Sequence, residues 1–470
     1  MDDSYELAEF GIDYALQNGA TYAEARVING FKTGFFLRKS SVVSGSRTPL
    51  EGIGFRVLAG GGLGFSSVEQ LAEKNVKEAL DTGLKMARIS NPEEKIDFGE
   101  PIANEAKWKV DYKENLADIA NETIVYLLKE MDKKAEDHSI NNRTHVFESH
   151  RFKKYLVTSE GTKIHADLSM LKYFAILSCK GRLDTEQRWV DFTRSTGWEG
   201  TETWIDSMDR ECETLVKVAM NPAKILAGKV DFVVGPEVAG IIAHENCGHP
   251  SEGDRIMGRE GAQAGESFWK DLKLKESKIG SEYVTLCDDP VIPGTGGYYL
   301  FDDEGVKARK RVLIKEGIIN EPLLNREFGV KFGLGSNGAS RAENFDREPI
   351  IRMANTYFAP GDFTFEELVE GIKHGVFMNS FTEWNIDDRR YQSKYVGQEC
   401  YLIENGEVTE TMVRRPVLEI TSVGLFSSVD GVTNELIFDF PGVCGKSDPG
   451  QGVPVHAGGG YVRMRDILLG

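Results

Sequence analysis

Two histidines stand five residues apart in a segment that otherwise reads as a buried helix, and this spacing limits how the chain can fold there. Residues 244–249 are His-Glu-Asn-Cys-Gly-His. On a regular α-helix, side chains at i and i+5 diverge by about 140°, whereas those at i and i+4 are about 40° apart. The two rings can share one site if the helix widens into a turn with i→i+5 hydrogen bonds. They can also do so if the helix ends at Gly248, which permits a positive φ, with Pro250 forbidding continuation.

The residues before this motif predict a strand, a turn and a helix that would hold it in a fixed position. Residues 229–234 have the apolar content of a buried strand, Gly235-Pro236 predicts a turn, and residues 237–243 predict a helix that runs into His244. A strand that leads directly into a ligand-bearing helix fixes the direction of the helix side chains.

The residue types of the motif are those of a metal-dependent hydrolase. Neutral imidazoles suit Zn²⁺, and a catalytic zinc site uses three protein ligands and leaves one position to water. Glu245 directly follows the first histidine, so it does not easily turn back to the same ion and is placed to take a proton from water. We therefore predict a metal site at His244 and His249, with Glu245 as the general base.

Four residues are candidates for the third ligand: Glu252, Asp254, Cys444 and His456. Glu252 and Asp254 follow the motif closely and could equally orient an imidazole without touching the metal. His456 lies in a Gly-rich segment predicted to be a loop, where a surface histidine is the simpler interpretation. Cys444 lies in a turn-rich segment, and the nearby Lys446 together with a metal would favour the thiolate that a metal requires. A set of two histidines and Cys444 would keep one position open.

Length and charge set the general class of the protein. A chain of 470 residues predicts two or three domains. The net charge of −18 is spread along the chain, which argues against a surface for nucleic acid. The six cysteines form no CxxC pair, so we expect no disulfide scaffold. The acidic start and the lack of an apolar run of membrane-spanning length predict a cytoplasmic protein without a membrane segment.

The first half of the chain predicts a mixed α and β domain. Helical patterns cover residues 5–18, 68–90 and 112–137, and residues 41–66 have the Gly and Ser content of hairpins. Strand-like segments cover residues 25–37 and then return as short pieces at 144–148, 155–158, 172–179 and 189–193. No internal repeat of fixed period is evident.

The second half predicts a β-rich domain, because short β-like runs alternate there with Gly, Pro and Asp. We place the boundary at 225/226. The expected architecture is α+β: an N-terminal α/β domain over 1–225, followed by a barrel-like or folded-sheet domain over 226–470 that carries the metal helix.

These motifs together resemble the TldD/PmbA family of metallopeptidases. The resemblance is clearest over residues 230–460. It rests on His244 to His249 with Glu252-Gly-Asp254, on Cys444-Gly-Lys446 with residues 452–455, and on the segments Asp302 to Gly305 and Arg347 to Gly361. PmbA-type members lack the HExxxH motif, so this chain resembles the TldD side of the family.

The resemblance implies one zinc ion per chain, held by His244, His249 and Cys444, with Glu245 as base. It also implies a dimer, either with an identical chain or with a PmbA-like companion, that encloses the site in a chamber admitting short or unfolded peptides. An extended peptide would lie along a sheet edge, where main-chain pairing does not select side chains. Arg352, His374 and residues 384–391 are candidates for the cavity lining.

Two other functions fit the same residues. One is metal-dependent hydrolysis of a non-peptide amide or ester. The other is a binding or maturation protein with a structural metal, although a structural zinc site normally fills all four positions with Cys or His.

Overall fold

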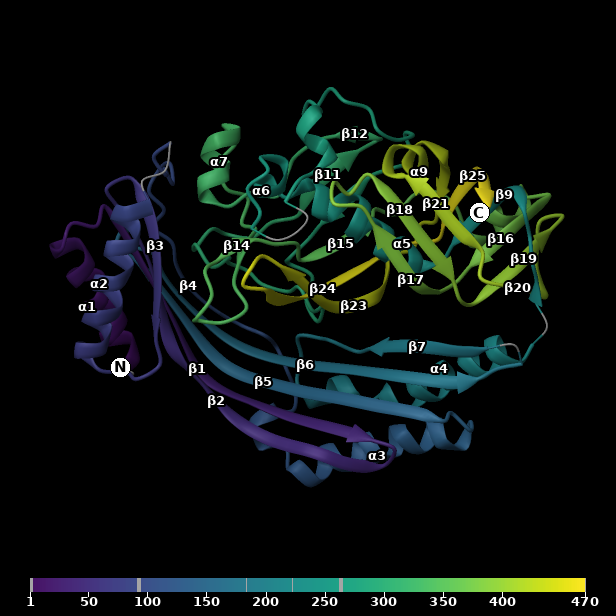
Figure 1. Ribbon diagram of the computed structural model, residues 1–470, viewed down its shortest axis with the longest axis horizontal. Coiled ribbons are helices and arrows are strands. Elements are labelled where there is room, and N and C mark those ends of the chain that lie inside the picture. Colours follow the sequence, from purple (N-terminus) through teal and green to yellow (C-terminus); the bar gives the residue numbers. More distant parts are fainter. Residues whose placement is uncertain (1–2, 91–93, 183, 222, 262–264, 470) are drawn as a thin grey trace.

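The structure, a computed structural model, describes residues 3–90, 94–182, 184–221, 223–261 and 265–469. A long curled sheet forms the N-terminal part, and a body of shorter strands lies against the concave side of this sheet (Figure 1). Helices and strands are mixed throughout. This confirms the predicted class of an N-terminal α/β part followed by a β-rich C-terminal part.

The N-terminal sheet has the strand order β3-β2-β1-β5-β6-β4, and β7 pairs with β6. Its strands are β1 Tyr22–Arg38, β2 Ser41–Ala59, β3 Gly62–Val68, β4 Glu105–Lys109, β5 Asn142–Thr158, β6 Lys163–Lys180 and β7 Thr185–Asp191. The helices of this part are α1 Asp3–Gln17, α2 Glu73–Ser90, α3 Asn121–Asp137 and α4 Trp204–Met220. Helices α1 and α2 cover one end of the convex face, and α3 and α4 cover the other (Figure 1).

This part contains a structural repeat that the sequence did not reveal. A helix, three antiparallel strands and a helix occur twice, as α1-β1-β2-β3-α2 and as α3-β5-β6-β7-α4. Strands β1 and β5 both have 17 residues and begin 142 − 22 = 120 positions apart. Phe31 pairs with Arg151, also 120 positions apart, so the centre of the β1–β5 pair lies on a pseudo-twofold axis.

The short strands predicted at 144–148 and 155–158 are one continuous strand, β5, and α4 was not predicted. Between those two pieces β5 carries His150, Lys153 and Lys154, which hide the period of two that a half-buried strand shows. His150 and Lys154 line a cavity on the concave face and Lys153 is exposed, so none of the three has to fit into a dry core.

The C-terminal part contains two larger sheets, of order β12-β11-β10-β15-β24-β23 and β17-β18-β21-β25-β9-β16-β19-β20-β8, with β22 paired to β25, and a short β13-β14 pair. The strands before residue 360 are β8 Ala223–Lys224, β9 Gly228–Val234, β10 Leu286–Asp288, β11 Arg311–Lys315, β12 Ile318–Ile319, β13 Ser340–Arg341, β14 Ile350–Ile351 and β15 Asn355–Phe358. The later strands are β16 His374–Met378, β17 Phe381–Ile386, β18 Gln392–Gly397, β19 Cys400–Glu404, β20 Glu407–Val413, β21 Val417–Thr421, β22 Val429–Val432, β23 Ile437–Lys446, β24 Gln451–Gly459 and β25 Val462–Leu469. The helices of this part are α5 Pro236–Ala243, α6 Gly253–Ile256, α7 Arg326–Phe332, α8 Phe365–Glu370 and α9 Ser422–Ser428.

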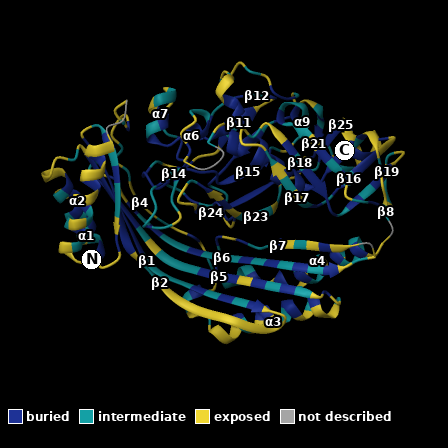
Figure 2. Cartoon of the chain, viewed as in Figure 1, coloured by how far each residue is buried: buried dark blue, intermediate teal, exposed yellow. Residues whose placement is uncertain are grey.

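Helix α5 is the centre of the C-terminal part. It follows β9 through Gly235, as the sequence predicted. All eight of its residues are buried, and five of them, Val238, Ala239, Ile241, Ile242 and Ala243, belong to a hydrophobic cluster that spans both sheets. The interior of this part is dark blue in Figure 2, whereas the first half of β2 is exposed. Strands β1 to β7 share one sheet and β8 already pairs with β20, while the exact boundary at 225/226 stays a prediction.

Buried ion pairs fasten the two parts together. Arg56 of β2 lies between Glu24 of β1, at 2.9 Å, and Glu304 of the C-terminal part, at 2.7 Å, with all three side chains buried. Beside them, Lys154 of β5 donates to Asp303 at 2.5 Å. The Asp302 to Gly305 segment therefore connects the parts rather than contributing to the metal site.

Over the described part of the chain, no helix combines the length and the apolar content that a bilayer crossing requires. All six cysteines are buried and free.

Candidate metal centre

A single π-helical turn, His244–Gly248, continues α5 and brings the two histidines together. The N–H of His249 donates to the carbonyl of His244, which is the i→i+5 bond. The ring centroids of His244 and His249 are 4.9 Å apart, with the rings nearly perpendicular at 82°. The first of the two predicted alternatives is therefore the one that occurs. Gly248 has a φ of −56°, so the alternative with a positive φ does not.

Side chains on both sides of the turn hold it in this shape. Asn246 donates to Ser422 at 2.8 Å and to Ser393 at 3.1 Å, and it accepts from the Tyr395 hydroxyl, so its side chain is anchored to β18 and to α9. Gly248 packs so closely that a Cβ atom there would lie 1.9 Å from the Met353 sulfur. Close packing, not a left-handed backbone, is the reason for glycine at 248.

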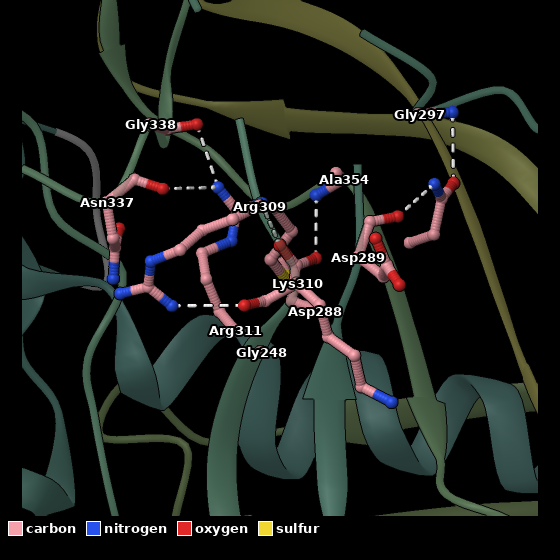
Figure 3. A network of polar contacts seen from close by, with 12 residues as sticks. Gly248, Asp288, Asp289, Gly297, Arg309, Lys310, Arg311, Asn337, Gly338 and Ala354 are labelled. Atoms are coloured by element: carbon pink, nitrogen blue, oxygen red, sulfur yellow. Dashed lines mark hydrogen bonds and ion pairs between the residues drawn. The ribbon is translucent and has the colours of Figure 1, made fainter. Parts of the chain in front are cut away.

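The turn lies over a buried polar network that fixes its neighbours. Asp288 of β10 and Arg311 of β11 form a fully buried ion pair, and Arg311 also donates to the carbonyl of Gly338 at 2.8 Å (Figure 3). The other oxygen of Asp288 accepts from the N–H of Ala354 at 2.8 Å. This bond holds the chain next to Met353, and thereby the surface against which Gly248 packs.

Cys444, near the end of β23, completes a cluster with the two histidines. The Sγ atom of Cys444 lies 3.4 Å from Nε2 of His249, and the ligand atoms of the three residues lie within 4.8 Å of one another. Each of the three side chains is buried. Nδ1 of His244 is buried without a hydrogen-bond partner in the described residues. A soft thiolate, two imidazoles and an orphaned buried nitrogen fit a zinc ion, although the assignment of these residues as ligands stays a prediction.

Protonation in the cluster favours metal binding. Burial lowers the pKa of His244 and so favours the neutral ring. For Cys444, burial opposes the thiolate, but the neighbouring His249 and Arg352 outweigh it and lower the pKa to about 7. Arg352 also donates to the carbonyl of Cys444. The sequence assigned this effect to Lys446, whereas in the structure Lys446 is paired with Glu252 and Asp254, and the guanidinium beside Cys444 is that of Arg352.

Glu252, Asp254 and Lys446 form a second layer behind His249. Glu252 accepts from Nδ1 of His249 at 3.0 Å, which leaves Nε2 of the ring to face Cys444. The Lys446 ammonium lies 3.3 Å from Glu252 and 2.7 Å from Asp254, and it is fully buried. Burial opposes the ionisation of Glu252, yet Lys446 and His249 hold the pKa of this carboxyl well below its ordinary value. Of the alternatives open at the sequence level, Glu252 takes the orienting position and not a place in the cluster.

Glu245 lies beside the cluster and is held by two donors. Trp384 Nε1 donates to one oxygen of Glu245 at 3.1 Å, and Arg390 donates to the other at 2.8 Å. Burial raises the pKa of Glu245, but His249, His244 and Arg390 together reverse this and leave it below its ordinary value. Arg390 has a φ of 59° in the turn between β17 and β18, a left-handed conformation that is costly for a residue with a side chain.

These groups open into a cavity of about 770 Å³, here called the metal cavity, between the N-terminal sheet edge and the C-terminal part. One face of α5 and the π turn lines it, with Glu237, Ile241, His244 and Glu245. Strand β7 and helix α4 form the opposite wall, and Arg188 of β7 bridges Glu237 and Glu211. The contribution of β7 and α4 was not predicted, because the pattern of a strand or a helix does not indicate which other element it faces.

The remaining candidates divide between this cavity and other places. Trp384 and Arg390, from the segment 384–391, line the metal cavity as expected. His456 also lines it, and the prediction of a surface loop was wrong, because His456 is buried in strand β24. Arg352 lies behind Cys444, and His374 is exposed on β16 and does not line the metal cavity.

The fold and this cluster define a class of protein: a two-part protein in which a His, His, Cys cluster with an adjacent glutamate opens into a cavity between the two parts. Comparison with known families agrees. Residues 227–470 match the PmbA/TldA metallopeptidase C-terminal domain, and residues 23–87 match PmbA/TldA metallopeptidase domain 1. The chain belongs to the TldD/PmbA family of metallopeptidases.

Two named relatives and one solved structure are similar to this chain over most of its length. A metalloprotease of Methanocaldococcus jannaschii is 30% identical over 94% of this chain and 95% of its own length. A zinc metalloprotease TldD homologue of Saccharolobus solfataricus is 25% identical, over 89% of this chain and 90% of its own. TldE from Thermococcus kodakarensis has the same fold, with a TM-score of 0.76 at 16% identity over 99% of both chains.

Proposed function

We propose that this protein is a zinc-dependent peptidase that hydrolyses short or unfolded peptides inside the metal cavity. The observation that carries the proposal is the position of Glu245, which directly adjoins a buried His, His, Cys cluster and lines the metal cavity. Metalloprotease names among relatives of similar length support the reaction class.

His244, His249 and Cys444 would hold the ion, which when bound supplies Lewis acidity for water and for the scissile carbonyl. Glu252 and Lys446 fix the ring of His249, so the direction of one ligand is set before any substrate binds. The Glu245 carboxylate takes a proton from the attacking water and passes it to the leaving amine. Trp384 and Arg390 hold that carboxylate in place during both transfers.

Strand β23 supports a peptide over other substrates. It is the outer strand of its sheet, it lines the metal cavity from Phe438 to Gly445, and it carries Cys444. An extended peptide that paired with this edge would run past Glu245 whatever its side chains. Hydrolysis of a small non-peptide amide would not need such an edge, so profiling oligopeptides against small acyl amides separates the two activities.

A binding or maturation protein with a structural metal is the remaining alternative. Within the described residues the cluster contains three ligand residues, whereas a structural zinc site normally has four. Metal analysis together with the geometry of the loaded site would decide this point, because a fourth protein ligand would favour the structural role.

We further propose that the protein acts as a dimer, with an identical chain or with a PmbA-like companion, in the cytoplasm. The first half of β2 supports a partner. From Ser41 to Pro49 it is exposed, its outer edge lies beyond the pairing with β3, and Val42 and Val43 are 43% and 58% exposed. Long uncovered edges of this kind are normally protected or paired.

Replacement of Glu245 by glutamine tests the peptidase proposal. The variant keeps the shape of the side chain and removes the base, so turnover should fall by at least about a hundredfold while zinc content stays the same. Peptide cleavage by zinc-loaded protein is followed by mass spectrometry, and zinc content by elemental analysis. Unchanged turnover with full zinc occupancy would refute the role of Glu245.

A further inference from the structure

A second cavity, of about 300 Å³, lies between the concave face of the N-terminal sheet and the loops of the C-terminal part. Its sheet wall is formed by residues of β1, β2, β4, β5 and β6, among them Lys32 of β1, Glu148 and His150 of β5, and Lys172 of β6. Trp108 of β4 and Tyr298 of the C-terminal part also line it. None of these residues belongs to the metal cluster.

Cations outnumber their partners on this wall. In the strand register, Lys32 of β1 lies opposite His150 of β5, and Glu148 of β5 lies opposite Lys172 of β6. Glu148 accepts from Lys32 at 3.1 Å through one oxygen and from His150 at 3.0 Å through the other. Both oxygens of the carboxylate are therefore already engaged.

Lys172 is left without a direct partner. Among the residues that the structure describes, its ammonium makes no hydrogen bond or ion pair, although Arg26, Lys154 and Arg341, which line the same cavity, all do. Burial lowers the pKa of Lys172, and Glu148 and Glu343 counter this only from a distance. A partly buried cation without a partner carries a desolvation cost, and an anion that enters the cavity would offset that cost.

The second cavity adjoins the metal cavity. On β6, Lys172 lines the second cavity and Phe174, on the same face of the strand, lines the metal cavity. On β24, Pro454 lines the second cavity and Val455 the metal cavity. An extended chain with its scissile bond at Glu245 could thus reach Lys172 along the concave sheet face.

We propose that the second cavity binds the carboxyl terminus of the peptide, with Lys172 as the residue that holds the terminal carboxylate. This inference rests on the proposed peptidase function and adds a substrate class to it: peptides with a free carboxyl terminus, cleaved a fixed short distance from that end. Lys172 contacts the substrate far from the reacting atoms, so it determines specificity and takes no part in bond cleavage.

Binding of matched peptides tests this proposal without the need for turnover. A fluorescein-labelled Ala-Gly oligopeptide is prepared as the free acid, as the carboxyl-terminal amide, and as an amide that ends in Glu. Affinities for the zinc-loaded Glu245→Gln protein are measured by fluorescence anisotropy. The free acid should bind about tenfold more tightly than the plain amide, the size expected for one charge-assisted hydrogen bond.

Three variants then locate the contact. Lys172→Met should abolish the preference for the free acid, and Lys172→Arg should keep most of it. Lys153→Met is the matched control, since Lys153 is an exposed lysine on the neighbouring strand β5 that does not line this cavity, and it should bind like the parent.

Each outcome decides the matter. Equal binding of acid and amide by the parent, or an undiminished preference in Lys172→Met, overturns the proposal. If the amide ending in Glu binds as tightly as the free acid, the cavity accepts any carboxylate and the assignment to the chain terminus is wrong. Failure of the zinc-loaded parent to cleave any peptide would overturn the proposed function instead, and the binding preference would remain a separate result.

Discussion

At the scale of single residues, Cys444 is distinguished from the other cysteines by its charge environment. Burial raises the pKa of Cys212 to about 12 and that of Cys287 to about 11, whereas His249 and Arg352 outweigh burial at Cys444 and lower its pKa to about 7. In metal-free protein near neutral pH, we expect iodoacetamide to alkylate Cys444 first, at a rate that rises with pH through about 7, because the thiolate is the nucleophile. Bound zinc should block the reaction. Residue-by-residue mass spectrometry measures both effects.

The lowered pKa of Cys444 also predicts how the stability of the metal-free protein changes with pH. Because the pKa of Cys444 is lower in the folded protein than the ordinary 9.0, the unfolded chain binds more protons between these values. The contribution of the Cys444 thiolate to the free energy of unfolding is complete above about pH 9 and is lost as the pH falls through about 7. Metal-free Cys444→Ser should therefore lack part of the gain in unfolding free energy that the parent shows between neutral and alkaline pH. Equal gains in both proteins would contradict the assigned pKa.

At the scale of elements, the π turn depends on the absence of a side chain at position 248. A Cβ atom there would lie 1.9 Å from the Met353 sulfur, so Gly248→Ala must displace either Met353 or the turn that carries His249. We expect a loss of about 1–3 kcal/mol in unfolding free energy, the usual cost of overpacking. Zinc affinity should fall as well to the extent that the turn, and with it His249, is what moves. Chemical unfolding and zinc titration measure the two effects.

The double variant Gly248→Ala, Met353→Ala is the control for that prediction. Removing the Met353 side chain creates room for the new methyl group, so the double variant should lose less than the sum of the two single variants. Strict additivity would show that the clash with Met353 is not what makes glycine necessary.

The sequence predicted the helix and strand that lead into the metal site, but not the tertiary contacts that fix the site residues. The spacing of His244 and His249 led to a π turn as one of two solutions, and β9 and α5 lie where their patterns placed them. The role of Gly248 was misassigned, because its constraint comes from Met353, more than a hundred residues away. Cys444 and His456 lie in strands β23 and β24, whose Gly and Pro content is typical of turns but is tolerated in strands that line a cavity.

At the scale of the whole molecule, the curled N-terminal sheet brings together residues that no local pattern connects. Its concave face supplies the wall of the second cavity and, at the β7 edge, part of the wall of the metal cavity. Sequence periodicity reports whether a strand face is buried, but it does not report what the face is buried against. This is why the C-terminal motif was recognised while the contribution of β7, α4 and Lys172 was not.

The position of that sheet depends on Arg56, which joins β1 and β2 to the C-terminal part through Glu24 and Glu304. Arg56→Met would leave two buried carboxylates without their cation and should lower the unfolding free energy at neutral pH by about 3 kcal/mol. The loss should shrink under mildly acidic conditions, because the stranded carboxyl groups can then take up protons. Arg309→Ala is the control: it breaks the pair with Glu321, in which Arg309 is 53% exposed, and should cost less than about 1 kcal/mol. If thermal and chemical unfolding show the same small loss for both variants at both pH values, the buried pairs do not hold the two parts together.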